Sequence, residues 1–223
     1  MRILYNYPSR SRPALFRRGV ESIINNSAGT DYEILAIVDE NDPTLNDYDF
    51  TGCHVRIGQS KSKVDAINRG RDYILNSGAQ IIVNFSDDMI FTQKGFDDII
   101  RDSFIYYYDH IKEKYKDNLD YCIHFPDGST GDKLISMSVL GIDYYKRFNY
   151  IYNPEYVSLY CDNETMDVAK ILGKYKFVNE NIFVHLHPAN GNAFNDEQYR
   201  YTESFHPIDQ ATYLKRKANN FGL

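Results

Sequence analysis

Short apolar runs alternate with longer periodic segments in the first half of the chain. Residues 3–7, 33–38 and 80–85 are nearly continuous apolar runs, as expected for strands buried on both faces of a parallel sheet. Residues 55–57 form a further, shorter run. We therefore expect four strands before residue 90.

Three periodic segments lie between and after these runs. Each repeats apolar residues at a spacing of three or four, which predicts helices over residues 13–24, 63–76 and 96–115. Pro13 suits the first turn of a helix, and Gly78 follows the second segment as a stop signal. The alternation of strands and helices predicts an α/β fold with a mainly parallel sheet flanked by helices.

The second half of the chain is less regular. Its predicted strands cover residues 121–125, 134–140 and 181–187, and its predicted helices cover residues 143–148, 163–172 and 209–219. We expect Asp162 to be the N-cap of the helix that begins at residue 163. A length of 223 residues fits one α/β domain better than two. We therefore expect a single domain over residues 1–223, with a core to about residue 190 and a C-terminal helical tail over residues 191–223.

Charge and cysteine content narrow the function classes. The net charge is −6 and no long basic run occurs, so the overall electrostatic signature of a nucleic-acid-binding protein is absent. A local basic groove remains open near the N-terminus, at Arg10, Arg12, Arg17 and Arg18. Three widely spaced cysteines suggest neither a disulfide framework nor a zinc motif. With no signal-peptide pattern and no apolar run of about 18 residues, we expect a cytoplasmic protein without a membrane span.

Candidate ligand-binding residues follow several of the predicted strands. They are Pro8, Ser9, Arg10 and Arg12 after the first strand, Asp39 and Asp42 after the second, Asp87 and Asp88 after the strand at residues 80–85, and His187 after the last. Ligands of open α/β sheets bind outside the carboxyl ends of the strands. Paired carboxylates there favour Mg²⁺ or Mn²⁺ shared with a phosphate ligand, and a histidine favours Mn²⁺. Solvated loop carboxylates without a ligand are the alternative.

Other polar residues have both a functional and a purely structural explanation. His185 and His187 are two apart on a strand and face the same way, so one fits a metal ligand and the other its neighbour. Both also fit a half-buried strand. Lys61 and Lys63 flank a helix start, a position that suits phosphate, although each alone is more typical of a solvated surface.

Five stretches in this order resemble glycosyltransferase family 2 and its relatives, which share the GT-A fold. The resemblance covers roughly residues 2–190. The first three stretches are residues 5–13, the strand end Val38-Asp39, and the helical Ala66-Ile67-Asn68-Arg69-Gly70. The fourth, Ser86-Asp87-Asp88, is similar to the metal-binding Asp-x-Asp element of the family. The fifth, Asp162-Asn163-Glu164 at a helix start, is similar to its acidic catalytic element. The expected fold class is therefore GT-A, a Rossmann-like mixed sheet.

The resemblance implies a role for each matching position. Asp39 would recognise the donor base, with UDP-sugar as the expected donor, and Pro8, Ser9 and Arg10 would line the nucleoside pocket. Lys63 or Asn68 would contact the base or phosphates. Asp87 would lie near the ribose or the metal. Asp88 would bind the metal together with His187 or, as the second choice, His185. Asp162 or Glu164 would be the base that deprotonates the acceptor.

Two departures from the family pattern affect these roles. The first acidic position of the metal element is Ser86, so metal binding depends on Asp88 and Asp87. The catalytic element has an asparagine between its acidic residues, which leaves Asp162 and Glu164 as rival bases. The expected activity is a metal-dependent, inverting hexosyltransferase that uses Mn²⁺ or Mg²⁺.

Two other classes and several acceptors stay open. A nucleotidyltransferase shares the sheet, carboxylates and metal, but residues 8–13 lack the glycines of a phosphate-binding loop. A non-catalytic nucleotide-sugar-binding module would need no base. The acceptor is a glycan or, with the arginine cluster as its only support, a modified DNA base. The oligomeric state is not indicated.

Overall fold

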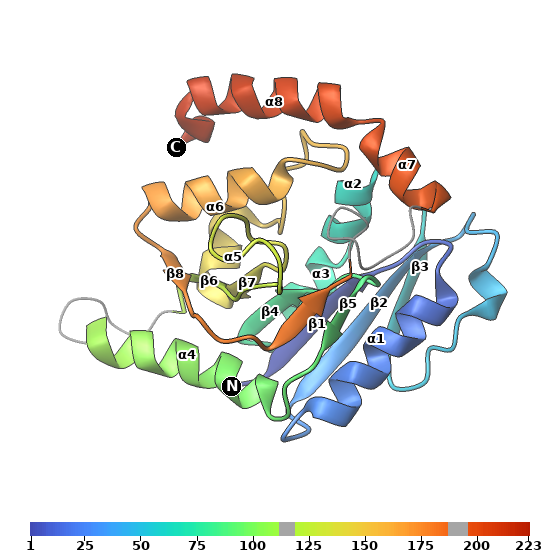
Figure 1. The fold of residues 1–223 in the computed structure, drawn as a ribbon, viewed down its shortest axis with the longest axis horizontal. Helices are drawn as coiled ribbons and strands as arrows, with labels where there is room; N and C mark the ends of the chain where they lie inside the picture. The colour runs from blue at the N-terminus through green and yellow to red at the C-terminus, as the bar shows by residue number, and fades with distance from the viewer. Residues whose placement is uncertain (112–118, 187–195) are drawn as a thin grey trace.

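The computed structural model describes residues 1–111, 119–186 and 196–223, and most of its strands form one mixed sheet (Figure 1). In spatial order the strands of this sheet are β3 (His54–Gly58), β2 (Tyr32–Asp39), β1 (Ile3–Pro8), β4 (Ile81–Asn84), β7 (Val139–Gly141), β6 (Cys122–His124) and β8 (Tyr175–Phe177). The first four run parallel, and β7 is antiparallel to both of its neighbours. A separate small sheet pairs β5 (Met89–Phe91) with β9 (Phe183–His185).

Helices cover both faces of the large sheet, which gives three layers and two cores. One core contains α1 (Pro13–Asn26), α4 (Phe96–Ile111) and the small sheet. The other contains α2 (Lys63–Asn68), α3 (Arg71–Asn76), α5 (Ile142–Phe148) and α6 (Cys161–Ile171). Alternation along each strand divides its side chains between the cores, so Tyr5 packs towards α4 while Leu4 packs towards α2. The predicted mixed, mainly parallel α/β fold is confirmed.

The predicted helix over residues 63–76 is two short helices. In a continuous helix the carbonyl of Ile67 would accept a hydrogen bond from the backbone N–H of Arg71. Here Nδ2 of Asn6 in β1 donates to that carbonyl at 3.0 Å. The chain lies so close to β1 that a Cβ on Gly70 would be 2.3 Å from Oδ1 of Asn6. Asn6 thus ends α2, and only glycine fits where α3 begins.

Other predictions also differ from the structure. The strand expected over residues 134–140 is limited to β7, and Asp162 is not the N-cap of α6, which begins at Cys161 after Tyr160. Tyr160 has a left-handed backbone with φ of 60°, and Oδ1 of Asp162 accepts from the adjacent Asn163 N–H at 2.9 Å, so no cap forms. The residues expected to end the helix at 115 lie outside the described part of the chain. The short strands β5 and β8 were not predicted, because three residues carry no readable period.

The C-terminal segment is part of the fold and consists of α7 (Glu197–Glu203) and α8 (His206–Ala218), which lies over α6 (Figure 1). Asp209 of α8 is fully buried, and its carboxylate accepts from the backbone N–H groups of Val157, Ser158 and Leu159 at 2.7–2.8 Å. Losing such an acceptor leaves buried donors unpaired, at about 1–3 kcal/mol each. Asp209 therefore fixes the loop that leads into α6.

No helix in the described residues is long and apolar enough to cross a membrane.

His124 in β6 predicts a specific pH dependence of stability. The ring is fully buried, with Nδ1 at 2.8 Å from the Tyr175 hydroxyl, and burial lowers its pKa from 6.5 to about 4. The unfolded chain therefore takes up this proton first as the pH falls. We expect the free energy of unfolding to decrease from about pH 6.5 down to about pH 4.

Urea unfolding at steps across that window would measure the decrease. His124→Phe keeps a ring in the cavity but cannot titrate, so its profile should be flatter than that of the unaltered chain. Parallel profiles would show that another group is responsible.

Candidate functional site

The turn after β4 brings Asp87 and Asp88 to the carboxyl ends of β1 and β4. The backbone N–H of Met89 donates to the carbonyl of Ser86 at 3.0 Å, and the N–H of Leu186 donates to the carbonyl of Asp88 at 2.7 Å. These bonds fix the turn between the two sheets. Both aspartates are buried, with exposed fractions of 5% and 7%. Two adjacent carboxylates without water require partners from the protein.

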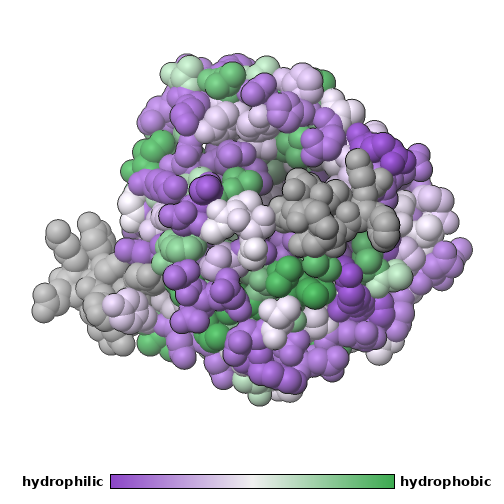
Figure 2. All heavy atoms as spheres, viewed as in Figure 1, coloured by the Kyte–Doolittle hydropathy of each residue, from purple (hydrophilic) through white to green (hydrophobic). Residues whose placement is uncertain are grey.

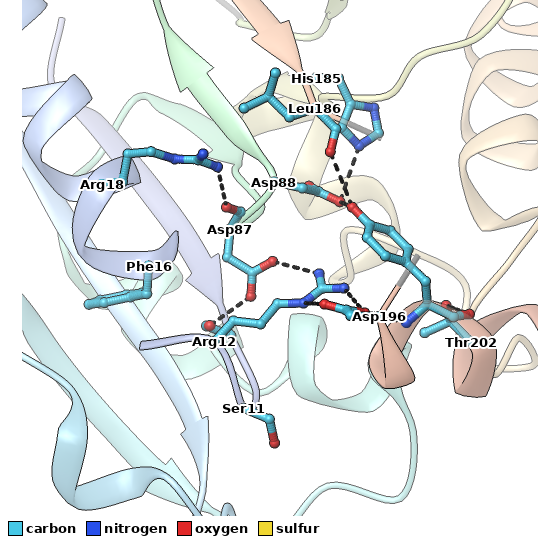
Figure 3. A network of polar contacts seen from close by, with 12 residues as sticks. Ser11, Arg12, Phe16, Arg18, Asp87, Asp88, His185, Leu186, Asp196 and Thr202 are labelled. Carbon is cyan, nitrogen blue, oxygen red and sulfur yellow. Dashed lines mark hydrogen bonds and ion pairs between the residues drawn. The ribbon is translucent and has the colours of Figure 1, made fainter. Parts of the chain in front are cut away.

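Asp87 is held by the loop that follows β1 (Figure 3). Its carboxylate accepts from the Ser9 hydroxyl at 2.7 Å and from Nη1 of Arg12 at 3.0 Å. Burial and the adjacent charge of Asp88 raise the pKa of Asp87, and Arg12 opposes this shift. Asp42 in turn holds the loop, because its carboxylate accepts from the backbone N–H of Ser11 at 2.7 Å.

Asp88 has one occupied and one unoccupied carboxylate oxygen. Its Oδ2 accepts from the hydroxyl of Tyr199 at 2.8 Å and lies 3.3 Å from Nε2 of His185. Its Oδ1 is buried and has no hydrogen-bond partner among the described residues. Burial alone would raise the pKa of Asp88, but His185 and Lys63 outweigh it and lower the pKa well below its usual range. The carboxylate is therefore anionic, with one oxygen available.

A divalent ion fits these residues on two observations. A buried anionic oxygen without a partner is the donor that a hard cation requires. His185, with Nε2 at 3.3 Å from the same carboxylate, adds a nitrogen donor that Mn²⁺ accepts. No group of three His, Cys, Asp or Glu residues is gathered for a metal within the described ranges. His187, the favoured histidine of the sequence analysis, lies outside those ranges.

His185 lies between two carboxylates. Its Nε2 faces Asp88, and its Nδ1 is 3.8 Å from Oδ2 of Asp127. Burial lowers its pKa, but the two aspartates outweigh burial and raise the pKa to about 9. The register of the small sheet, in which Met89 pairs with His185, places the ring beside Asp88.

The segment before and within α7 contributes to the site, which the sequence did not indicate. Arg12 forms two hydrogen bonds to Asp196, at 2.9 and 2.7 Å, and its guanidinium lies 4.2 Å from the ring centroid of Tyr199 (Figure 3). Asp196 caps α7 by accepting from the N–H of Tyr199 at 2.9 Å. That cap is readable in the sequence as a helix start, but no local signal connects it to Arg12 or Asp88.

At the end of β2, the structure brings Arg10 to Asp39. Nη1 of Arg10 donates to Oδ2 of Asp39 at 2.8 Å, and Nη1 of Arg69 donates to Oδ1 at 3.0 Å. Arg69 was not among the predicted site residues, although it belongs to the stretch that resembles the family. Pro8 ends β1, and the N–H of Ser9 continues the pairing with the carbonyl of Ile37 at 3.0 Å.

Asn68 has a structural task in the described residues. Its Nδ2 donates to the carbonyl of Tyr152 at 2.7 Å, and its Oδ1 accepts from the N–H of Ile151 at 3.0 Å. Both ends of the amide are thereby used to hold the loop after α5.

The two rival bases point in different directions. Glu164 is buried against α8, where it accepts from Nε of Arg216 and from the Tyr156 hydroxyl, each at 2.7 Å. Asp162 is partly exposed, and burial raises its pKa while the charges of Lys63 and His185 act against that rise. The charge of Lys63 also lowers the pKa of Asp88, so Lys63 and His185 act on both Asp88 and Asp162.

The N-terminal arginines are used within the protein. Arg10 and Arg12 pair as described above, Arg17 pairs with Glu21 at 3.1 Å, and Nη2 of Arg18 approaches the carbonyl of Asp87 at 3.5 Å. These contacts give the DNA-base acceptor no added support.

A hollow of about 380 Å³ opens on the outer side of β9. Val184 and Gly128 line it, and Val184 points away from the side on which its neighbour His185 faces Asp88. In Figure 2 an apolar patch at the centre of this face lies over the small sheet. The hollow is thus separate from the carboxylate site.

Comparisons with solved structures identify the fold. A mannosyltransferase, PcManGT, from Pyrobaculum calidifontis, solved with GDP-Man and Mn²⁺, matches with a TM-score of 0.66 and 9% identity over 96% of this chain and 64% of that one. TarS of S. aureus in complex with UDP matches with a TM-score of 0.55 and 9% identity over 82% of this chain and 59% of that one. The chain thus has the GT-A fold and spans less than two thirds of each of these structures. No protein-family model and no curated protein sequence matches it.

Arg12 should contribute strongly to stability, because it is the buried partner of two carboxylates. Its side chain is 8% exposed, and its removal would leave Asp87 buried beside Asp88 without a cation. We expect Arg12→Met to lower the free energy of unfolding by about 3–5 kcal/mol. Urea unfolding at pH 7 would measure this loss.

Arg17→Met is the matched control, since Arg17 lies on α1 and pairs with the exposed Glu21. It should cost at most about 1 kcal/mol. Equal losses in the two variants would contradict the structural role given to Arg12.

Proposed function

We propose that the protein is a metal-dependent glycosyltransferase that moves a sugar from a nucleoside diphosphate to an acceptor hydroxyl. The observation that carries this proposal is the buried Oδ1 of Asp88, which has no hydrogen-bond partner in the described part of the chain and lies beside His185 at the carboxyl edge of a GT-A sheet. The solved structures of the same fold, which hold GDP-Man with Mn²⁺ or UDP, support it.

The donor would lie across the carboxyl ends of β1, β2 and β4. Asp39 lies at the end of β2, where each of its carboxylate oxygens accepts from one arginine, Arg10 or Arg69, and keeps a second lone pair for a base N–H. The proposed donor is a UDP-sugar, and Pro8, Ser9 and Arg10 border the same edge. Asp87, fixed by Ser9, is on the ribose side. Lys63 supplies positive charge towards Asp88 and fits a phosphate contact better than Asn68, whose amide is already used.

Asp88 and His185, with His187 as a third candidate, would hold Mn²⁺ or Mg²⁺. When bound, the ion supplies positive charge against the negative charge that develops on the departing diphosphate. Tyr199 keeps Oδ2 of Asp88 oriented through its hydroxyl, and Arg12 offsets the charge of Asp87. These contacts keep both buried carboxylates oriented.

Asp162 is the proposed general base. Its raised pKa brings it closer to neutral pH, where a base is most effective. It would accept the proton of the acceptor hydroxyl as that oxygen attacks the anomeric carbon and the bond to the diphosphate breaks. A single displacement of this kind inverts the anomeric centre. Glu164 is not assigned this role because Arg216 and Tyr156 occupy its carboxylate.

A thermal-shift panel tests donor and metal together. UDP, GDP, CDP and dTDP would each be added with Mn²⁺, with Mg²⁺ or with EDTA. At one hundred times its dissociation constant, a ligand adds about 2.7 kcal/mol to the free energy of unfolding. We expect UDP to stabilise the chain with Mn²⁺, and EDTA or Asp88→Asn to remove most of the effect.

Asp120→Asn is the control for loss of a buried carboxylate, because Asp120 pairs with Lys174 away from the site. It should keep the nucleotide shift. No shift with any nucleotide would overturn the proposed function, and a shift unaffected by EDTA would overturn its metal dependence.

Asp162→Asn should lower the rate of nucleoside diphosphate release from the donor by about 10²–10⁴-fold, because the acceptor or water loses its base. Donor binding in the thermal-shift assay should stay unchanged. Glu164→Gln should instead lower stability and keep the turnover number of the folded protein. The reverse pattern would make Glu164 the base.

A further inference from the structure

Asp127 is a buried carboxylate that the proposed mechanism does not use. It lies in the loop after β6 and is 1% exposed. Its Oδ1 accepts from the backbone N–H groups of Ser129 and Thr130 at 2.8 and 2.7 Å. Its Oδ2 accepts from the Ser136 hydroxyl at 3.0 Å. All three hydrogen bonds lie within the connection between β6 and β7.

The task of Oδ2 involves His185. The oxygen is 3.8 Å from Nδ1 of His185, on the side of the ring opposite to Asp88. The backbone adds a second connection, since the N–H of His185 donates to the carbonyl of Asp127 at 3.0 Å. Asp127 thus contacts His185 through its backbone carbonyl and through its carboxylate.

We propose that Asp127 is the positioning residue for His185: a divalent ion displaces the proton on Nε2, which faces Asp88, while Asp127 keeps the other proton on Nδ1. This inference rests on the proposed function. A carboxylate that faces the outer nitrogen of a ligating histidine fixes its tautomer and orientation, and losing it typically weakens metal binding by about 10–100-fold.

An asparagine at this position has a predictable orientation. The N–H groups of Ser129 and Thr130 both require an acceptor, so the amide oxygen must take the place of Oδ1. The amide NH₂ group then faces Nδ1 of His185 in place of an acceptor. Nδ1 becomes the acceptor, the proton moves to Nε2, and the nitrogen that faces Asp88 can no longer bind a cation.

The test is a titration of the full chain with Mn²⁺ alone, in which the signal of free Mn²⁺ is followed by electron paramagnetic resonance. We expect Asp127→Asn to raise the Mn²⁺ dissociation constant about 10–100-fold. Asp127→Ser keeps an acceptor for the loop N–H groups but cannot reach His185, so it should weaken binding similarly and serves if the asparagine variant does not fold.

Two matched controls separate positioning from a general loss of structure. Asp120→Asn removes another buried carboxylate, which precedes β6 whereas Asp127 follows it. Ser136→Ala removes the other partner of Oδ2 of Asp127. Both should keep the Mn²⁺ affinity of the unaltered chain, whatever stability they lose.

The outcomes are distinguishable. If the unaltered chain binds Mn²⁺ and both Asp127 variants bind it equally well, this inference is wrong and the proposed function stands. If Asp120→Asn weakens binding as much as Asp127→Asn, the effect is structural and the inference is also wrong. If the unaltered chain binds no Mn²⁺, the proposed metal site fails, and the positioning role fails with it.

Discussion

The site depends on the burial of two adjacent carboxylates at the end of β4. Asp87 and Asp88 repel each other in a region that water does not screen, so the fold must bring partners to both. The partners come from distant parts of the chain. Ser9 and Arg12 follow β1, His185 ends β9, and Tyr199 belongs to α7. The C-terminal segment is thus needed to satisfy Asp88, through the hydroxyl of Tyr199.

Two parts of this arrangement were readable in the sequence. Apolar runs identified β1, β2 and β4, and parallel strands expose their carboxyl ends on one edge, so Ser9, Asp39 and Asp87 were expected to lie near one another. The GT-A fold was also expected from the order of the motifs, and the solved structures bear it out. The first inference needed only the period along the chain, and the second rested on the resemblance of these motifs to a known family.

The remaining parts depend on contacts that no local pattern encodes. The sequence period predicts only that residues 185 and 187 face the same way. The pairing of β9 with β5, itself too short to predict, places His185 beside Asp88. Asp162 and Glu164 could be distinguished only once α8 was known to bring Arg216 to Glu164, 52 residues away. The contact of Arg12 with Asp196 spans 184 residues and joins segments with no shared motif.

Arg12 also makes the carboxylate pair and the C-terminal segment thermodynamically dependent on each other. The same guanidinium pairs with Asp87 and Asp196, and the ring beneath it carries the hydroxyl that reaches Asp88. A ligand that alters the charge at the carboxylates must therefore also alter the free energy with which α7 packs on Arg12. By reciprocity, the docking of α7 changes the affinity for that ligand by the same factor. A substitution that weakens the contact of α7 with Arg12 would thus change ligand affinity without contacting the ligand.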